Sequence, residues 1–208
     1  MSKIGVPSEE IIKAINLYKA DMLVLGVHGI HRGIAYLMLG SNTEKILLSA
    51  TCPTLTVGAH VLGGVKLGLR PKEIIYISDF SSEAAAAAPY ALLLAKEFEV
   101  PLDVCQLMPE IAEDNADIRQ KLAERYCERM AQLTSKLRTE WSLPAFHLEH
   151  GMEMDQIIKR AATQLAGLIV LGVRTRSHLG RRLHTSFAYQ LLAKATCPVL
   201  TIRDQRSS

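Results

Sequence analysis

The sequence predicts an α/β fold with a doubly wound, five-stranded parallel sheet, present once as a complete unit and once as a partial copy. Two observations lead to this prediction. Between residues 73 and 202, five short apolar runs alternate with helical segments. Such alternation is typical of parallel strands joined by helices that cover both faces of a sheet. The second observation is an internal repeat near the N-terminus.

The repeat consists of two ungapped blocks. Residues 5–29 match residues 151–175 at nine of 25 positions, and residues 40–57 match residues 185–202 at eight of 18 positions. Nothing upstream of residue 5 corresponds to the segment 68–150, so the first copy holds only the last elements of a unit. We therefore expect a partial domain at 1–60, a glycine-rich linker at 61–71 and a complete domain at 72–204.

The elements expected within this frame follow from hydrophobic periodicity and from start and stop signals. An alanine run favours a helix that begins near Ser81, and Pro89 should bend it. The expected strands are 22–27, 54–57, 73–78, 101–108, 145–149, 168–173 and 198–202, and the expected helices are 8–19, 41–49, 81–96, 111–137, 155–165 and 185–194.

Composition limits the classes of function. The formal net charge of +3 over 208 residues is too small to indicate a nucleic-acid partner. We see no secretory signal and no apolar run of the roughly 18 residues that would span a bilayer. The cysteines have no metal-ligand or disulfide spacing, which favours a cytoplasmic protein with reduced thiols. They are Cys52, Cys105, Cys127 and Cys197.

One loop of the first copy has the pattern of a phosphate site. The strand 22–27 leads into Gly26 and Gly29, and Gly40 and Ser41 open the next helix. Glycines let a backbone approach a ligand closely, and free amides at a helix N-terminus favour an anion. The alternative interpretation is structural: the glycines shape a turn and Ser41 caps the helix.

This loop resembles the signature of the universal stress protein family, in which Gly, two residues, Gly, nine residues and Gly-Ser or Gly-Thr follow the fourth strand. Residues 77–81, 104–109 and 196–202 are similar to the ends of the family's first, second and last strands. The resemblance implies a Rossmann-like fold, similar to adenine nucleotide alpha hydrolases. It also implies that ATP is the candidate cofactor, with no metal predicted.

Carried over residue by residue, the resemblance implies nucleotide contacts in both copies, although neither set is complete. The first copy has ten residues between its second and third glycines, where the family has nine, and it lacks the first strand. In the second copy Thr175 and Thr185 replace two glycines. The implied contacts are Gly26, Gly29, Gly40, Ser41 and Asn42 in the first copy, and Asp79, Leu107, Gly172 and Ser186 in the second.

Four arginines lie in the corresponding loop of the second copy. Their guanidinium groups could bind an anion by charge where backbone amides no longer do so. The alternative is a basic loop exposed to solvent. The four residues are Arg174, Arg176, Arg181 and Arg182.

Two strands and two helices cannot bury their own apolar faces. Since the family pairs through last strands, the resemblance implies that Thr54–Val57 lies antiparallel to Val199–Ile202, as a pseudo-dimer or in a homo-oligomer. No nucleophile, acid–base pair or metal cluster accompanies the loop, so an enzyme has little support. We expect a non-catalytic stress-response module acting through dimerisation and partner contacts. The alternatives are an ATP-binding switch that uses the first loop, and the soluble regulatory portion of a transporter.

Overall fold

The computed structural model describes residues 4–27, 40–58, 60–61, 71–79, 81–107, 146–152, 154–163, 167–173 and 183–204, and seven positions between 117 and 128. Its elements, in chain order, are α1 (Pro7–Tyr18), β1 (Leu23–Val27), α2 (Ser41–Ser49), β2 (Thr54–Gly58), β3 (Ile74–Ser78), α3 (Ser82–Phe98), β4 (Leu102–Leu107), β5 (Phe146–Met152), α5 (Met154–Thr163), β6 (Leu168–Val173), α6 (Leu183–Lys194) and β7 (Val199–Arg203).

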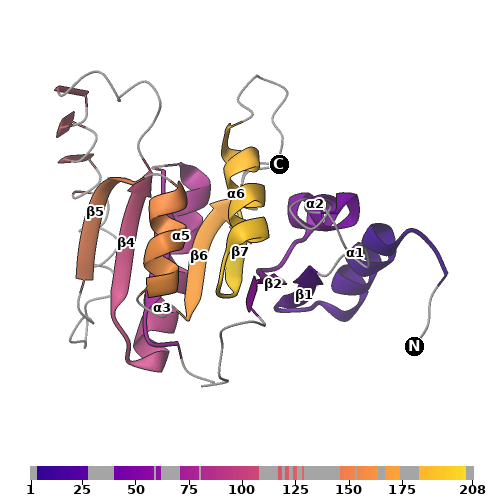
Figure 1. The fold of residues 1–208 in the computed structure, drawn as a ribbon. Helices are drawn as coiled ribbons and strands as arrows, with labels where there is room; N and C mark the ends of the chain where they lie inside the picture. The colour runs from indigo at the N-terminus through magenta and orange to yellow at the C-terminus, as the bar shows by residue number, and fades with distance from the viewer. Residues whose placement is uncertain are drawn as a thin grey trace.

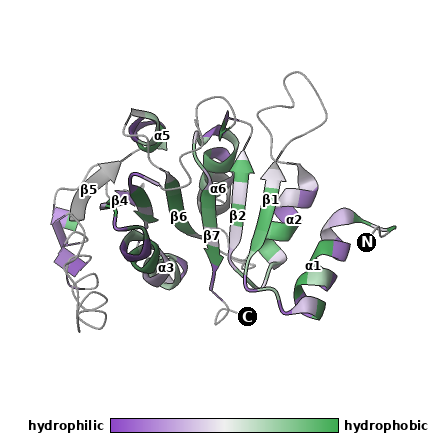
Figure 2. Ribbon diagram, turned by 90° about the horizontal axis from the view of Figure 1, so that it is seen from below, coloured by the Kyte–Doolittle hydropathy of each residue, from purple (hydrophilic) through white to green (hydrophobic). Residues whose placement is uncertain are grey.

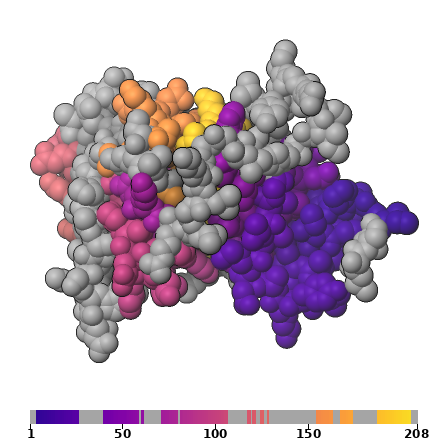
Figure 3. All heavy atoms as spheres, turned by 60° about the horizontal axis from the view of Figure 1, so that its bottom comes forward, coloured from indigo at the N-terminus to yellow at the C-terminus, as the bar shows by residue number. Residues whose placement is uncertain are grey.

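The strands form a single sheet of seven in the order β1-β2-β7-β6-β3-β4-β5 (Figure 1). Every neighbouring pair is parallel except β2 and β7, which are antiparallel. The five strands of the second copy are all parallel to one another, so the predicted α/β fold with its doubly wound, five-stranded parallel sheet is confirmed. The first 60 residues extend that sheet at one end, and in Figure 3 they form a lobe on one side of the molecule.

The antiparallel pairing joins the two copies of the repeat. Leu55 lies opposite Leu200, Thr54 opposite Thr201 and Thr56 opposite Val199. Leu55 and Leu200 are equivalent positions of the repeat, so the pairing is symmetric about them and has a local twofold axis. The buried Thr201 hydroxyl donates a hydrogen bond to the Thr54 carbonyl oxygen at 3.1 Å. The strand pairing expected between the two copies is thus present within one chain.

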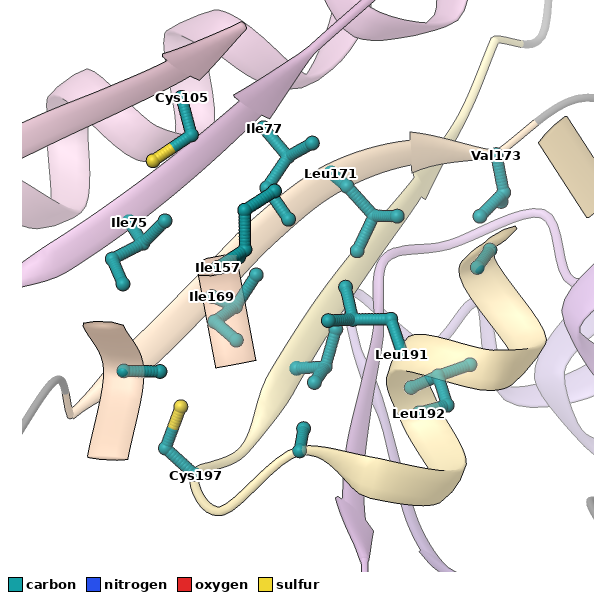
Figure 4. Packing of buried hydrophobic residues seen from close by; sticks show 14 of the residues in the cluster. Ile75, Ile77, Cys105, Ile157, Ile169, Leu171, Val173, Leu191, Leu192 and Cys197 are labelled. Carbon is teal, nitrogen blue, oxygen red and sulfur yellow. The ribbon is translucent and has the colours of Figure 1, made fainter. Parts of the chain in front are cut away.

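Helices cover the two faces of the sheet in different ways (Figure 2). On one face α5, α6 and Leu47 of α2 pack against alternate residues of β3, β6 and β7, with Ile157, Leu191 and Ile169 at the centre (Figure 4). On the other face α3 packs its alanines against Tyr76 and against residues of β6 and β7. We call this second side the α3 face of the sheet.

Some element bounds differ from the predicted ones. Helix α6 begins at Leu183, two residues before the expected start, and β5 begins and ends later than expected. Pro89 lies inside α3, which continues to Phe98. The predicted helix 111–137 and the predicted linker 61–71 fall largely outside the described residues.

A buried ion pair ties α5 to the sheet. Asp103 is the second residue of β4 and its side chain is 1% exposed, and Arg160 of α5 reaches its carboxylate through Nε. A buried charge is costly unless it is paired, so this contact fixes how α5 lies over β4.

We expect Arg160→Met to lower the free energy of unfolding by about 3 kcal/mol, because it leaves the Asp103 carboxylate buried without its partner. The double variant Asp103→Leu with Arg160→Met should recover most of this loss. Urea unfolding of the single and double variants measures both effects. A double variant no more stable than Arg160→Met would contradict this account.

Candidate functional site

In the first copy, the described residues leave the start of α2 exposed. Gly40 is the N-cap, with φ −62° and ψ 147°, and a Cβ added there would meet no atom of the described part of the chain within 4 Å. Ser41 and Asn42 are exposed in the first turn, where backbone amides have no partner within the helix. The interpretation in which Ser41 caps this helix is wrong, because the N-cap of α2 is Gly40. Exposed Gly26 belongs to the neighbouring β1, and Gly29 lies outside the described residues.

The second copy differs at the equivalent position. Ser186 corresponds to Ser41 in the repeat, yet it is the fourth residue of α6 and not the first of its helix. The amide of a fourth helical residue already takes part in the hydrogen-bond ladder of the helix. The Ser186 amide is therefore not available to a phosphate in the way that the Ser41 amide is.

Gly172 has a packing role in this structure. A Cβ added to Gly172 would lie 2.2 Å from the carbonyl carbon and oxygen of Glu83 and 2.5 Å from the amide nitrogen of Ala84. The first turn of α3 thus rests directly on β6. Tyr76 of β3 strengthens this contact, because its hydroxyl donates a hydrogen bond to the Ala84 carbonyl at 2.6 Å.

Asp79 also takes part in the start of α3. Its Oδ1 accepts hydrogen bonds from the amide of Ser81, at 3.0 Å, and from the Ser81 hydroxyl. The Ser81 hydroxyl in turn accepts from the Ala84 amide at 3.1 Å, which makes Ser81 the N-cap of α3. Both polar side chains after β3 are therefore engaged in ending the strand and starting the helix.

Other predicted site residues are placed only in part. Leu107 ends β4 and Ser186 lies in α6, and neither side chain belongs to the described part. Arg174, Arg176, Arg181 and Arg182 fall outside the described residues. Among the described residues no group of three or more His, Cys, Asp or Glu side chains could hold a metal ion. In the same part of the chain, no helix is both long and apolar enough to cross a membrane.

A family model for the universal stress protein family matches residues 1–58 and 71–203. The chain belongs to the universal stress protein family. A universal stress protein of Methanocaldococcus jannaschii is 28% identical over 143 residues, which are 65% of this chain and 84% of that protein.

Two solved structures share the fold over nearly the whole chain. One is a functionally unknown protein of Pseudomonas aeruginosa, with a TM-score of 0.67 and 18% identity. The match covers 98% of this chain and 70% of that protein. The other is a universal stress protein of Archaeoglobus fulgidus, with a TM-score of 0.64 and 21% identity. The match covers 96% of this chain and 67% of that protein.

The structure shows an exposed apolar surface that the sequence indicated only indirectly. Two strands and two helices were expected to be too few to bury their own apolar faces. In the structure Met22 is 48% exposed and Val24 is 64% exposed. Six of the nine exposed large hydrophobic side chains among the described residues lie in the first 24 positions, and we call them the N-terminal apolar surface. They are Ile4, Val6, Leu17, Tyr18, Met22 and Val24.

The glycines of the two copies should respond differently to the same substitution. We expect Gly172→Ala to lower the free energy of unfolding by about 1–3 kcal/mol, because its Cβ would overlap the backbone of α3. Gly40→Ala should cost less than about 1 kcal/mol, since its Cβ enters open space and only the N-cap preference changes. Thermal and urea unfolding give both values, and an equal cost at the two sites would contradict the packing role of Gly172.

The buried thiols should be chemically inert. Burial, with a smaller contribution from the Asp103 carboxylate, raises the pKa of Cys105 to about 12, and burial raises the pKa of Cys197 to about 12. Because only the thiolate reacts, a raised pKa slows alkylation at every pH below it. We expect iodoacetamide to label both residues much more slowly at pH 8 in the folded chain than in urea. Peptide mapping by mass spectrometry resolves each site, and equal rates in the two states would contradict their burial.

Proposed function

We propose that the chain is a non-catalytic stress-response module that acts through dimerisation and partner contacts, and that nucleotide binding is weak or lost in its C-terminal part. The observation that carries the proposal is the N-terminal apolar surface. Large exposed apolar surfaces mark interaction sites on soluble proteins, and six of the nine exposed large hydrophobic side chains among the described residues lie in the first 24 positions.

The second copy supports the nucleotide part of the proposal. Its phosphate position is altered in two ways: Thr175 and Thr185 stand where the family has glycines, and α6 begins three residues before Ser186. Asp79, the residue expected near the base, already accepts two hydrogen bonds from Ser81. A nucleotide would therefore lack the Ser186 amide as a donor and would meet an Asp79 carboxylate that already accepts two hydrogen bonds.

One observation favours the alternative, an ATP-binding regulatory switch. The start of α2 keeps an open Gly40 with exposed Ser41 and Asn42 beside it, next to the end of β1. Amides at a helix N-terminus can bind a phosphate group. A base pocket for that loop would have to come from outside the described residues.

The two functions are separated by calorimetric titration of ATP, with the mass in solution followed as the protein concentration changes. The proposal predicts no saturable heat at millimolar ATP and a mass above that of the monomer. Micromolar binding of ATP by a chain that stays monomeric would contradict it.

If ATP binds at the start of α2, Gly40→Asp should weaken the affinity at least about tenfold, because a carboxylate would face the phosphate oxygens across the free amides. Gly40→Asn is the matched control, since it has the same size, caps the helix equally well and has no charge. The interaction-module proposal predicts the same result, an absence of saturable heat, for both variants and the parent chain.

A further inference from the structure

Among the described residues nothing covers the outer edge of β1 or the adjoining α3 face, although the equivalent surface of the second copy is covered. Strand β6, the repeat equivalent of β1, pairs with β3 along Ile74 to Ile77. Strand β1 pairs only with β2 among the described strands, and β1 lies at the end of the sheet. An edge strand with no charged residue and no proline is a ready template for another strand.

Equivalent residues of the two copies differ in how far they are exposed on the α3 face. Val24 is 64% exposed and its equivalent Val170 is 0% exposed, and Met22 is 48% exposed where Leu168 is 8% exposed. The cover in the second copy is α3, which lies against Val170 and Leu168 through buried alanines. Nothing equivalent to α3 precedes β1 in the described residues.

The two copies offer almost the same surface to a covering segment. Residues 24–27 and 170–173 are identical, Val-Leu-Gly-Val. The register also agrees, because Gly26 lies opposite Val57 and Gly172 lies opposite Ile202, which are equivalent pairs. In the second copy Gly172 is the position at which the backbone of α3 makes its closest approach, and the first copy keeps glycine there.

On the opposite face of β1, helix α1 is less completely buried than its equivalent in the second copy. Ile11 of α1 is half-buried, whereas its equivalent, Ile157 of α5, is fully buried above the sheet. A strand added beside β1 would place its side chains beneath α1 on one side and below a covering helix on the other. An added strand alone would leave Val24 exposed, so the surface fits a strand together with a helix.

We propose, on the basis of the interaction function above, that this surface docks a strand–helix segment of a second polypeptide. The docked strand is uncharged, apolar on both faces and parallel to β1. The helix that follows it presents small side chains, mainly alanine, to Val24, Gly26 and Leu55. Segment β3–α3 of this chain has this chemistry and already binds the equivalent surface of β6 and β7.

The test uses residues 71–100 of this chain, carried on a soluble fusion partner and labelled for fluorescence anisotropy, titrated with the intact 208-residue chain. We expect saturable binding at a one-to-one ratio. Val24→Asp in the intact chain should weaken it at least tenfold, because a carboxylate would enter the apolar contact. Leu93→Asp in the intact chain is the matched control, because Leu93 is 57% exposed on α3 and lies outside this surface. The affinity of this variant for the labelled segment should equal that of the parent chain.

A second variant keeps the test independent of folding in the intact chain. Ala88→Asp in the added segment changes a residue that is fully buried against the sheet in the second copy, and it should abolish binding to the unchanged chain. Circular dichroism of the Val24→Asp chain should match that of the parent.

Absence of saturable binding, or equal binding by Val24→Asp, would overturn the docking proposal. If the segment does not bind while Val24→Asp abolishes self-association of the chain, a second copy covers this surface. That result refutes strand–helix docking and leaves the proposed function intact. Micromolar ATP binding by a monomeric chain refutes the proposed function, whatever the segment does.

Discussion

The structure depends on the antiparallel pairing of β2 with β7. Without it, the first copy of the repeat would consist of two strands and two helices, too few to form a core of their own. The pairing places equivalent leucines, Leu55 and Leu200, opposite each other and makes one sheet from two copies. Because the sheet is continuous, Leu47 of α2 joins the core formed by α5 and α6, and Leu55 contacts the core formed by α3. The first copy has only a small buried cluster of its own, formed by Ile15, Ala50 and Cys52, and the pairing joins it to the larger cores of the second copy.

The two copies then diverge in complementary ways. The second has its full cover, with α3 resting on Gly172 and every residue of β3 buried, but α6 begins too early for Ser186 to lie at a helix N-terminus. The first has an open helix start at Gly40 and Ser41 but lacks the cover over Val24. The family's nucleotide pattern and its packing pattern are therefore divided between the copies. This division is why we favour interaction over nucleotide binding.

Much of the fold could be predicted from the internal repeat, because the identical residues at 24–27 and 170–173 predicted equivalent strands. The pairing of the two last strands was predicted by the resemblance to the family and not by the repeat itself. The start of α6 could not be predicted, since the residues before Thr185 contain no N-cap signal that distinguishes Leu183 from its neighbours. Gly172 fits a phosphate loop in the sequence, and its packing role becomes visible only when α3 lies 2.2 Å from its missing Cβ. Hydrophobic periodicity likewise predicts the same environment for Val24 and Val170. Only the position of α3 explains why Val170 is buried and Val24 is exposed.

Hydrogen exchange at the β2–β7 pairing tests the central claim most directly. If the two copies form one continuous sheet, the amides of Thr54–Val57 that face β7 should exchange as slowly as those of Val199–Ile202, because both belong to one ladder between buried strands. The amides of β1, at the edge of the sheet, should exchange faster. Rapid exchange throughout β2 while β6 and β7 remain protected would contradict the continuous sheet, and with it the account of how the first copy is stabilised.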